Sequence, residues 1–160
     1  MDNIDSLRQI PLFKDLNDNY LNKIRAISSD VIFNTGQRIF NEGDIGYSLY
    51  IVYSGSVRVL KKSHTENEEV AILTPGNHFG EMALIDEGTR SATLEAIEPT
   101  KLIQIKREDL ENLLATDIDL AHQIYRTMAK YLCLRLRQTT KEYASTTEAV
   151  NMLNSYISQY

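Results

Sequence analysis

The chain has very little cysteine and no long hydrophobic run. The single cysteine, Cys133, excludes an intrachain disulfide framework and a metal site built from several thiolates. The longest apolar stretch runs only from Leu49 to Tyr53, whereas a helix that spans a bilayer needs about 20 apolar residues. Residues 1–5 are acidic and lack the hydrophobic core of a signal peptide. We therefore expect a cytosolic protein without a membrane segment.

Positive charge is also in short supply. The sequence carries 17 Lys and Arg residues against 22 Asp and Glu residues, which gives a formal net charge of −5. Such a balance is poorly suited to binding nucleic acid, because the phosphate backbone is recognised by basic patches. The 160 residues, of which 42% are hydrophobic, are enough to bury the core of one domain.

Hydrophobic spacing divides the chain into three regions. These are a helical lead-in at residues 1–30, a β-rich domain with following helices at 31–143, and a short amphipathic extension at 144–160. In the lead-in, apolar residues recur at i, i+4 and i+7, and they predict a helix that Asn17 or Asp18 caps.

Short runs of branched and aromatic residues recur through the second region. They lie at 31–33, 38–40, 49–52, 57–60, 70–73, 93–97 and 102–105. Turn residues separate them about every 8 to 12 residues, and all seven glycines of the chain fall between positions 36 and 88. Strands this short, with regular turns, predict a β-sandwich or a small barrel in which glycine forms the tight corners.

The last part of the chain is helical by its pattern. Residues 108–115 form a short amphipathic stretch. A longer helix is expected from Asp117 to about Tyr143, with Thr116 or Asp117 as its cap. Its apolar residues cover an arc of roughly 180°, although a surface helix needs only a little more than about 100° to face one core. The surplus predicts a second contact: a symmetry mate, a lid function, or the final apolar stripe at 148–160.

One segment, Pro75–Thr93, interrupts the strand pattern with residues too apolar for a solvated loop. Residues 82–85 are able to form one helical turn, whose free N–H groups face the space that Gly80 leaves open. A helix start attracts anions, and Arg90, nine residues after Glu81, supplies a countercharge. Together these features suit a ligand that carries hydroxyl groups and a single phosphate.

The same segment reads Phe79-Gly80-Glu81-Met82-Ala83-Leu84, followed by Arg90-Ser91-Ala92-Thr93. This pattern resembles the phosphate-binding cassette of the cyclic nucleotide-binding domains, F-G-E-x-A-L-(x)n-R-x-A-T. That family includes the catabolite activator protein, the regulatory subunits of cyclic-nucleotide-dependent kinases, and cyclic-nucleotide-gated channels. The upstream glycines and apolar residues are also similar, and residues 115–136 resemble the C-terminal helix of the family. The resemblance covers about residues 7–137.

The resemblance implies a mainly β, α+β fold: an eight-stranded jelly-roll-like β-roll with N-terminal helices and a long C-terminal helix. It also implies roles for single residues. Glu81 would accept hydrogen bonds from the ribose 2′-hydroxyl, and the Gly80 N–H would reach the ribose. Arg90 would pair with the cyclic phosphate, together with the N–H groups of residues 83–84. The expected binding residues are Gly80, Glu81, Met82, Ala83, Leu84, Arg90, Ser91, Ala92 and Arg135.

The choice of nucleotide and the contact to its base stay open in the sequence. Ser91 would offer its N–H and hydroxyl to the phosphate or the base. Threonine is common there in cGMP-selective kinases and serine occurs in the cAMP-binding activator, so Ser91 favours cAMP only slightly. The family caps the purine from its C-terminal helix, which falls near Arg135 or Leu136 here, one turn after Tyr131. Arg135 would stack its guanidinium over the base. Thr89 replaces a frequent proline and makes that corner less rigid.

Each of these residues also has an explanation without a ligand. Glu81 alone is typical of a solvated carboxylate in a first helical turn, and Arg90 alone of a surface charge or an ion pair. Arg135 lies in a basic run, which is usual toward the C-terminus of a solvated helix. His78 adjoins the cassette and is expected in a loop, and the two other histidines carry no signal.

The rival functional classes are an enzyme, a transcription factor and a scaffold. A metal-dependent cupin enzyme on a jelly roll needs several converging ligands, and His78 has no histidine partner at H-x-H spacing. Few residues follow Lys141, and they form no basic recognition helix, so direct DNA binding is not expected.

We therefore predict a non-catalytic sensor, without metal or further cofactor, that binds cAMP or, less favourably, cGMP. It would relay binding through its C-terminal helices to a protein effector or to a second copy of the chain. The alternatives are a ligand-independent scaffold and a transcription regulator that acts through a separate DNA-binding partner.

Overall fold

The computed structural model describes residues 3–62, 67–86 and 88–157. The helices are α1 (Asn3–Arg8), α2 (Asp18–Ala26), a 3₁₀ turn η1 (Glu81–Leu84), α3 (Arg107–Thr116) and α4 (Ile118–Ile157). The strands are β1 (Ser28–Phe33), β2 (Arg38–Phe40), β3 (Ser48–Ser54), β4 (Val57–Lys62), β5 (Asn67–Leu73), β6 (His78–Phe79), β7 (Thr93–Ala96) and β8 (Thr100–Lys106).

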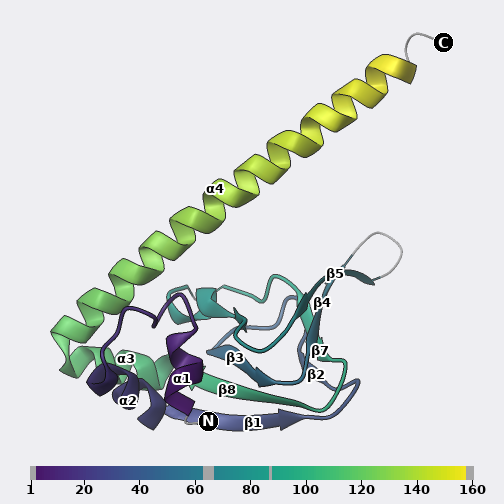
Figure 1. Cartoon of the computed structure of the whole chain (residues 1–160). Helices are drawn as coiled ribbons and strands as arrows, with labels where there is room; N and C mark the ends of the chain where they lie inside the picture. The colour runs from purple at the N-terminus through teal and green to yellow at the C-terminus, as the bar shows by residue number, and fades with distance from the viewer. Residues whose placement is uncertain (1–2, 63–66, 87, 158–160) are drawn as a thin grey trace.

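The strands form two four-stranded antiparallel sheets, in the orders β1-β8-β3-β6 and β2-β7-β4-β5. In the first sheet β3 pairs with β8, with Ser48 opposite Lys106, and in the second β4 pairs with β7. Apolar side chains of the two sheets meet inside the roll: Val52, Val57, Phe79, Leu94 and Leu102. The eight-stranded roll with helices at both ends of the chain confirms the predicted fold class (Figure 1).

The central strands carry two apolar faces, which explains their nearly continuous hydrophobic sequence. Val52 of β3 and Leu102 of β8 face the interior of the roll. Ile51 and Ile103 instead join a second core, because successive side chains of a strand point to opposite faces. The helices contribute further residues to that core: Leu7, Leu21, Ile24, Leu110, Leu114, Leu120, Ile124 and Met128. Helices from both ends of the chain are therefore fixed to the same sheet.

The starts of α2 and α4 carry the predicted caps. The Asn17 side chain accepts a hydrogen bond from the Tyr20 N–H at 2.9 Å, and Asp117 accepts one from the Leu120 N–H at 3.0 Å. Asp117 also accepts a hydrogen bond from Lys23 Nζ at 2.6 Å. This contact joins α2 to the start of α4, and so fixes where the long helix leaves the core.

The helix α4 is one continuous element of 40 residues, about 60 Å long, and it leads away from the roll (Figure 1). The expected end near Tyr143 is therefore wrong. Three hydroxyls around the expected break donate to carbonyl oxygens four residues earlier: Ser145 to Lys141, Thr146 to Glu142 and Thr147 to Tyr143. These residues thus satisfy their polar groups within the helix instead of ending it. Residues 158–160 lie outside the described part.

No helix in the described part of the chain is long and apolar enough to cross a membrane.

Candidate functional site

A pocket of about 330 Å³ opens where β6, η1 and the loop after η1 meet the second sheet and α4. It brings together eight of the nine residues predicted to bind a ligand: Gly80, Glu81, Met82, Ala83, Arg90, Ser91, Ala92 and Arg135. The ninth, Leu84, is instead packed into the core that the helices share with the first sheet. Any contact of Leu84 with a ligand would therefore have to come from its backbone.

The pocket also has an apolar wall that the sequence did not single out. Its side chains come from β2, β4, β5 and β7, and they are Phe40, Val59, Val70, Ala71, Leu73 and Leu94. The sequence placed these residues on strands, but alternation shows only which residues share a face, and not which face lines a cavity. An apolar wall of this kind suits an apolar part of a ligand.

Gly80 joins β6 to η1 in the left-handed region, with φ +77° and ψ 17°. A Cβ at this position would lie 2.8 Å from the Ser48 carbonyl oxygen and would collide with Arg90 Nη1. Gly46 lies against the same guanidinium, where a Cβ would come within 3.0 Å of Arg90 Cζ. Glycine is therefore needed at both positions for the arginine to lie where it does.

The turn η1 begins directly after Gly80, one residue earlier than the predicted turn at 82–85. Its Ala83 N–H, which the resemblance assigns to a phosphate, donates to the Gly80 carbonyl at 3.2 Å in this structure. The first N–H groups of a helix have no partner within the helix. The Ala83 N–H would therefore have to leave the Gly80 carbonyl in order to bind a ligand.

Arg90 is the most unusual charged group of the pocket, because only 8% of its surface is exposed. Its Nη2 donates to the Ser48 carbonyl at 2.9 Å, and its Cζ lies 4.2 Å from the centre of the Phe40 ring. Its Nε is buried without a hydrogen-bond partner, and none of the ion pairs of the described residues includes it. Burial lowers the pKa of the guanidinium, an effect that Tyr50, Asp44 and Glu81 oppose.

A buried cation without a counterion is costly, and an anion in the pocket would relieve this cost. Guanidinium groups match phosphate oxygens with two parallel hydrogen bonds. Two backbone hydrogen bonds fix the main chain at Arg90. Its N–H donates to the Asp44 carbonyl at 2.7 Å, and its carbonyl accepts from the Gly43 N–H at 2.9 Å. An anionic group beside Arg90 would therefore be favourable in this pocket.

Glu81 is the second buried charge, and its partner comes from α4. Arg135 Nη1 donates to Glu81 Oε1 in a short ion pair. Burial lowers the pKa of Arg135, but Glu81 and Tyr131 outweigh it, and the pKa is raised as a whole. The structure thus places Arg135 at the pocket, as predicted, while its guanidinium is held by a carboxylate. Ser91 also lines the pocket, and its carbonyl oxygen accepts from Lys61 Nζ at 2.7 Å.

His78 is a pocket residue that the sequence reading missed. It lies on strand β6 opposite Ile51, and not in a loop. Its ring centre is 5.0 Å from that of Tyr131 on α4, and its Nε2 is buried without a hydrogen-bond partner. Burial lowers the pKa of His78, with Arg135 acting in the same direction and Glu81 against it. The only available sequence signal was its position two residues before Gly80, next to the apolar Phe79.

Within the described ranges, no group of three or more His, Cys, Asp or Glu side chains is arranged to hold a metal ion.

Known sequences decide the family. A family model described as the cyclic nucleotide-binding domain matches residues 30–117. The chain belongs to the cyclic nucleotide-binding domain family. This is a family of regulatory domains, and the match takes in the whole cassette from Phe79 to Thr93.

Individual relatives agree with this assignment. The chain is 37% identical over 134 residues to the cyclic AMP receptor protein of Thermus thermophilus, covering 82% of this chain and 60% of the receptor. It is 28% identical over 139 residues to cGMP-dependent protein kinase, isozyme 1, of Drosophila melanogaster, covering 84% of this chain and 18% of the kinase. The solved N-terminal domain of a transcriptional regulator from Streptomyces coelicolor A3(2) matches with a TM-score of 0.77 and 34% identity, covering 86% of this chain and 94% of that domain. The chain therefore spans only part of the two curated relatives.

Proposed function

We propose that this chain is a cytosolic, non-catalytic sensor that binds cAMP and, less tightly, cGMP. The observation that carries this proposal is the buried guanidinium of Arg90, whose Nε has no partner in a pocket that also holds the buried carboxylate of Glu81. A cyclic nucleotide has one phosphodiester charge and one free ribose hydroxyl, which match these two groups. It requires no metal or further cofactor.

Each part of the nucleotide has a place in this pocket. Arg90 binds the cyclic phosphate, together with the N–H groups of residues 83–84 once the Ala83 N–H leaves the Gly80 carbonyl. Glu81 and the Gly80 N–H bind the ribose, and Met82 and Ala92 close the pocket around it. The apolar wall of β4 and β5 receives the purine, over which Arg135 stacks.

The preference for cAMP rests on weaker support than the binding itself. Ser91 lines the pocket next to Arg90 and suits either nucleotide. The relatives include proteins named for cyclic AMP and proteins named for cGMP, with identities of up to 37% and 35%, so they favour cAMP only slightly. We therefore place cAMP first.

The signal leaves the domain through α4. This helix brings Arg135 to the pocket, and directly after it exposes apolar residues to solvent. Leu136, Tyr143 and Val150 are 68%, 74% and 50% exposed, and they are spaced seven residues apart on one stripe. Nucleotide contacts at the cassette and at α4 shift the helix between a looser and a docked packing. The stripe passes this shift to a protein effector or to a second copy of the chain, without direct contact to DNA.

Calorimetric titration with cAMP and then with cGMP tests the proposal. The protein is first unfolded and refolded, so that nucleotide carried through purification is removed. We expect micromolar or tighter binding of cAMP, and the ratio of the two affinities gives the preference. Absence of binding to both nucleotides would overturn the sensor assignment and favour a ligand-independent scaffold.

A further inference from the structure

The ion pair between Glu81 and Arg135 connects the ligand pocket to the long helix. The Glu81 side chain is only 5% exposed, whereas that of Arg135 is 59% exposed. A carboxylate at this depth is unfavourable without a partner. In the described part of the chain, Arg135 is the cation that forms an ion pair with it.

Because Arg135 lies on α4, this ion pair attaches the helix to the pocket. The helix is anchored in the core by Leu120, Ile124 and Met128. From 129 to 148 every residue is exposed except Tyr131, whose ring meets His78. Beyond Met128, α4 meets the pocket at two places: the Tyr131 ring lies against His78, and Arg135 pairs with Glu81.

We propose that Arg135 is a positioning residue that holds α4 on Glu81 until the ribose of the nucleotide takes over this carboxylate. The inference rests on the proposed function, because the ribose 2′-hydroxyl and Arg135 then donate to the same group. A half-exposed ion pair contributes little net free energy, whereas a hydroxyl that donates to a carboxylate in a closed pocket forms a charge-assisted bond. The replacement of Arg135 by the ribose 2′-hydroxyl on Glu81 therefore has a small free-energy change, and binding of the nucleotide is able to drive it.

The exchange gives the 2′-hydroxyl a second role besides affinity. Once it occupies Glu81, Arg135 is free to move to the purine, and α4 is then held by the nucleotide and no longer by the protein carboxylate. A nucleotide that lacks the hydroxyl still meets Arg90, but it leaves the Glu81–Arg135 pair in place. The response of α4 should thus depend on the 2′-hydroxyl more strongly than phosphate binding does.

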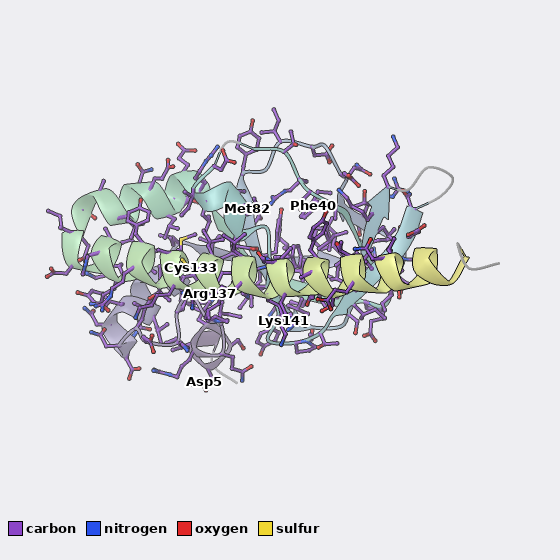
Figure 2. All side chains as sticks on the ribbon, turned by 90° about the horizontal axis from the view of Figure 1, so that it is seen from above. Asp5, Phe40, Met82, Cys133, Arg137 and Lys141 are labelled. Carbon is purple, nitrogen blue, oxygen red and sulfur yellow. The ribbon has the colours of Figure 1, made fainter. Side chains whose placement is uncertain are left out.

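A spin label on Cys133 reports on this step, because Cys133 is exposed and lies on α4 (Figure 2). It is also the only cysteine of the sequence, and it precedes Arg135 by two residues. We expect saturating cAMP to change the label spectrum of the full chain, and saturating 2′-deoxy-cAMP to leave it near the unliganded one. Calorimetry confirms that both nucleotides are bound. An equal response to both would overturn the proposal.

Variants without ligand test the ion pair independently. In Arg135→Ala and in Glu81→Gln, we expect amide hydrogen exchange in residues 129–148 to be about two- to fivefold faster than in the wild type, the range that a half-exposed ion pair accounts for. Arg137→Ala removes a charge from an exposed site two residues further along α4 and should change nothing. Unchanged exchange in both pair variants would refute the holding role. If neither nucleotide binds, the proposed function fails, while these unliganded measurements still decide whether the pair holds α4.

Discussion

Gly80 lies so close to the guanidinium of Arg90 that no side chain fits between them. A Cβ on Gly80 would collide with Arg90 Nη1 and would lie 2.8 Å from the Ser48 carbonyl, to which Arg90 Nη2 donates. The left-handed backbone at Gly80, with φ +77°, makes this approach possible. The glycine of the cassette therefore sets the position of its cation, in addition to turning the chain into η1.

The substitution Gly80→Ala tests this relationship. The left-handed conformation alone costs a residue with a Cβ about 1–2 kcal/mol, and the new methyl group must also displace Arg90. We expect the free energy of unfolding to fall by more than that amount, and the affinity for cAMP to fall at least tenfold. Thermal unfolding and calorimetric titration measure the two effects.

Gly36→Ala is the matched control. Gly36 has nearly the same φ, +78°, but an added Cβ there would meet no atom within 4 Å. It therefore carries the backbone cost without the collision, and its cAMP affinity should be that of the wild type. Equal loss of stability and equal affinity in the two variants would show that Gly80 does not position Arg90.

Removal of the guanidinium itself should have the largest effect on binding. Arg90→Ala leaves a phosphate buried without its charge partner, which costs roughly 2–5 kcal/mol, or on the order of 30-fold to a few thousandfold in affinity. Arg90→Lys keeps the charge but loses the planar fork, so its affinity should lie between those of Arg90→Ala and the wild type. Titration of both variants with cAMP measures the difference. Binding by the alanine variant within a factor of three of the wild type would contradict the assignment of the phosphate site.

Local patterns predicted a β-sandwich or a small barrel from seven short runs, and they missed the short strand β6. The eight-stranded roll and the roles of the pocket residues were implied by the resemblance of the cassette. Regular turn residues marked the strands, and Asn17 and Asp117 marked the helix starts, because these signals act over a few residues. The cassette was also visible, since Glu81 and Arg90 lie on one short segment and keep a fixed spacing.

The features that the sequence did not reveal depend on contacts between distant segments. Glu81 and Arg135 are 54 residues apart, and they meet because α4 is anchored in the core through Leu120, Ile124 and Met128 and then passes the pocket. His78 became a pocket residue only when β6 paired with β3 and α4 placed Tyr131 over it. No periodicity in one segment contains such information.

The buried His78 predicts how stability depends on pH. Burial lowers its native pKa below the unfolded value of 6.5, and among the charged groups that face it Arg135 adds to this effect while Glu81 opposes it. Between the two pKa values the unfolded chain binds more protons, so the free energy of unfolding falls as the pH drops below 6.5. Chemical denaturation of the wild type and of His78→Gln from about pH 7.5 to 5 should show the slope in the wild type and a flatter curve in the variant.

Two comparisons keep this test specific to His78. Glu42 and Asp117 have lowered pKa values in the native state. Their contributions to the free energy of unfolding are lost only as the pH falls below the unfolded pKa values of 4.5 and 3.8, outside this pH range. His122→Gln changes an exposed histidine of α4 and should keep the wild-type slope. If the slope persists in His78→Gln but disappears in His122→Gln, the pH dependence comes from His122, and the prediction for His78 is wrong.

The exposed stripe of α4 predicts self-association of the full chain. Leu136, Tyr143 and Val150 repeat every seven residues, which is the spacing that lets two helices pack along a common seam. Sedimentation velocity over a range of concentrations should show a dimer, and the double change Leu136→Glu with Tyr143→Glu should give a monomer, because two carboxylates cannot be buried in the seam. Leu134→Glu is the control, since Leu134 is 63% exposed but lies off the stripe. A wild type that stays monomeric with and without cAMP would exclude the second copy, and the stripe would then be left for a different protein effector.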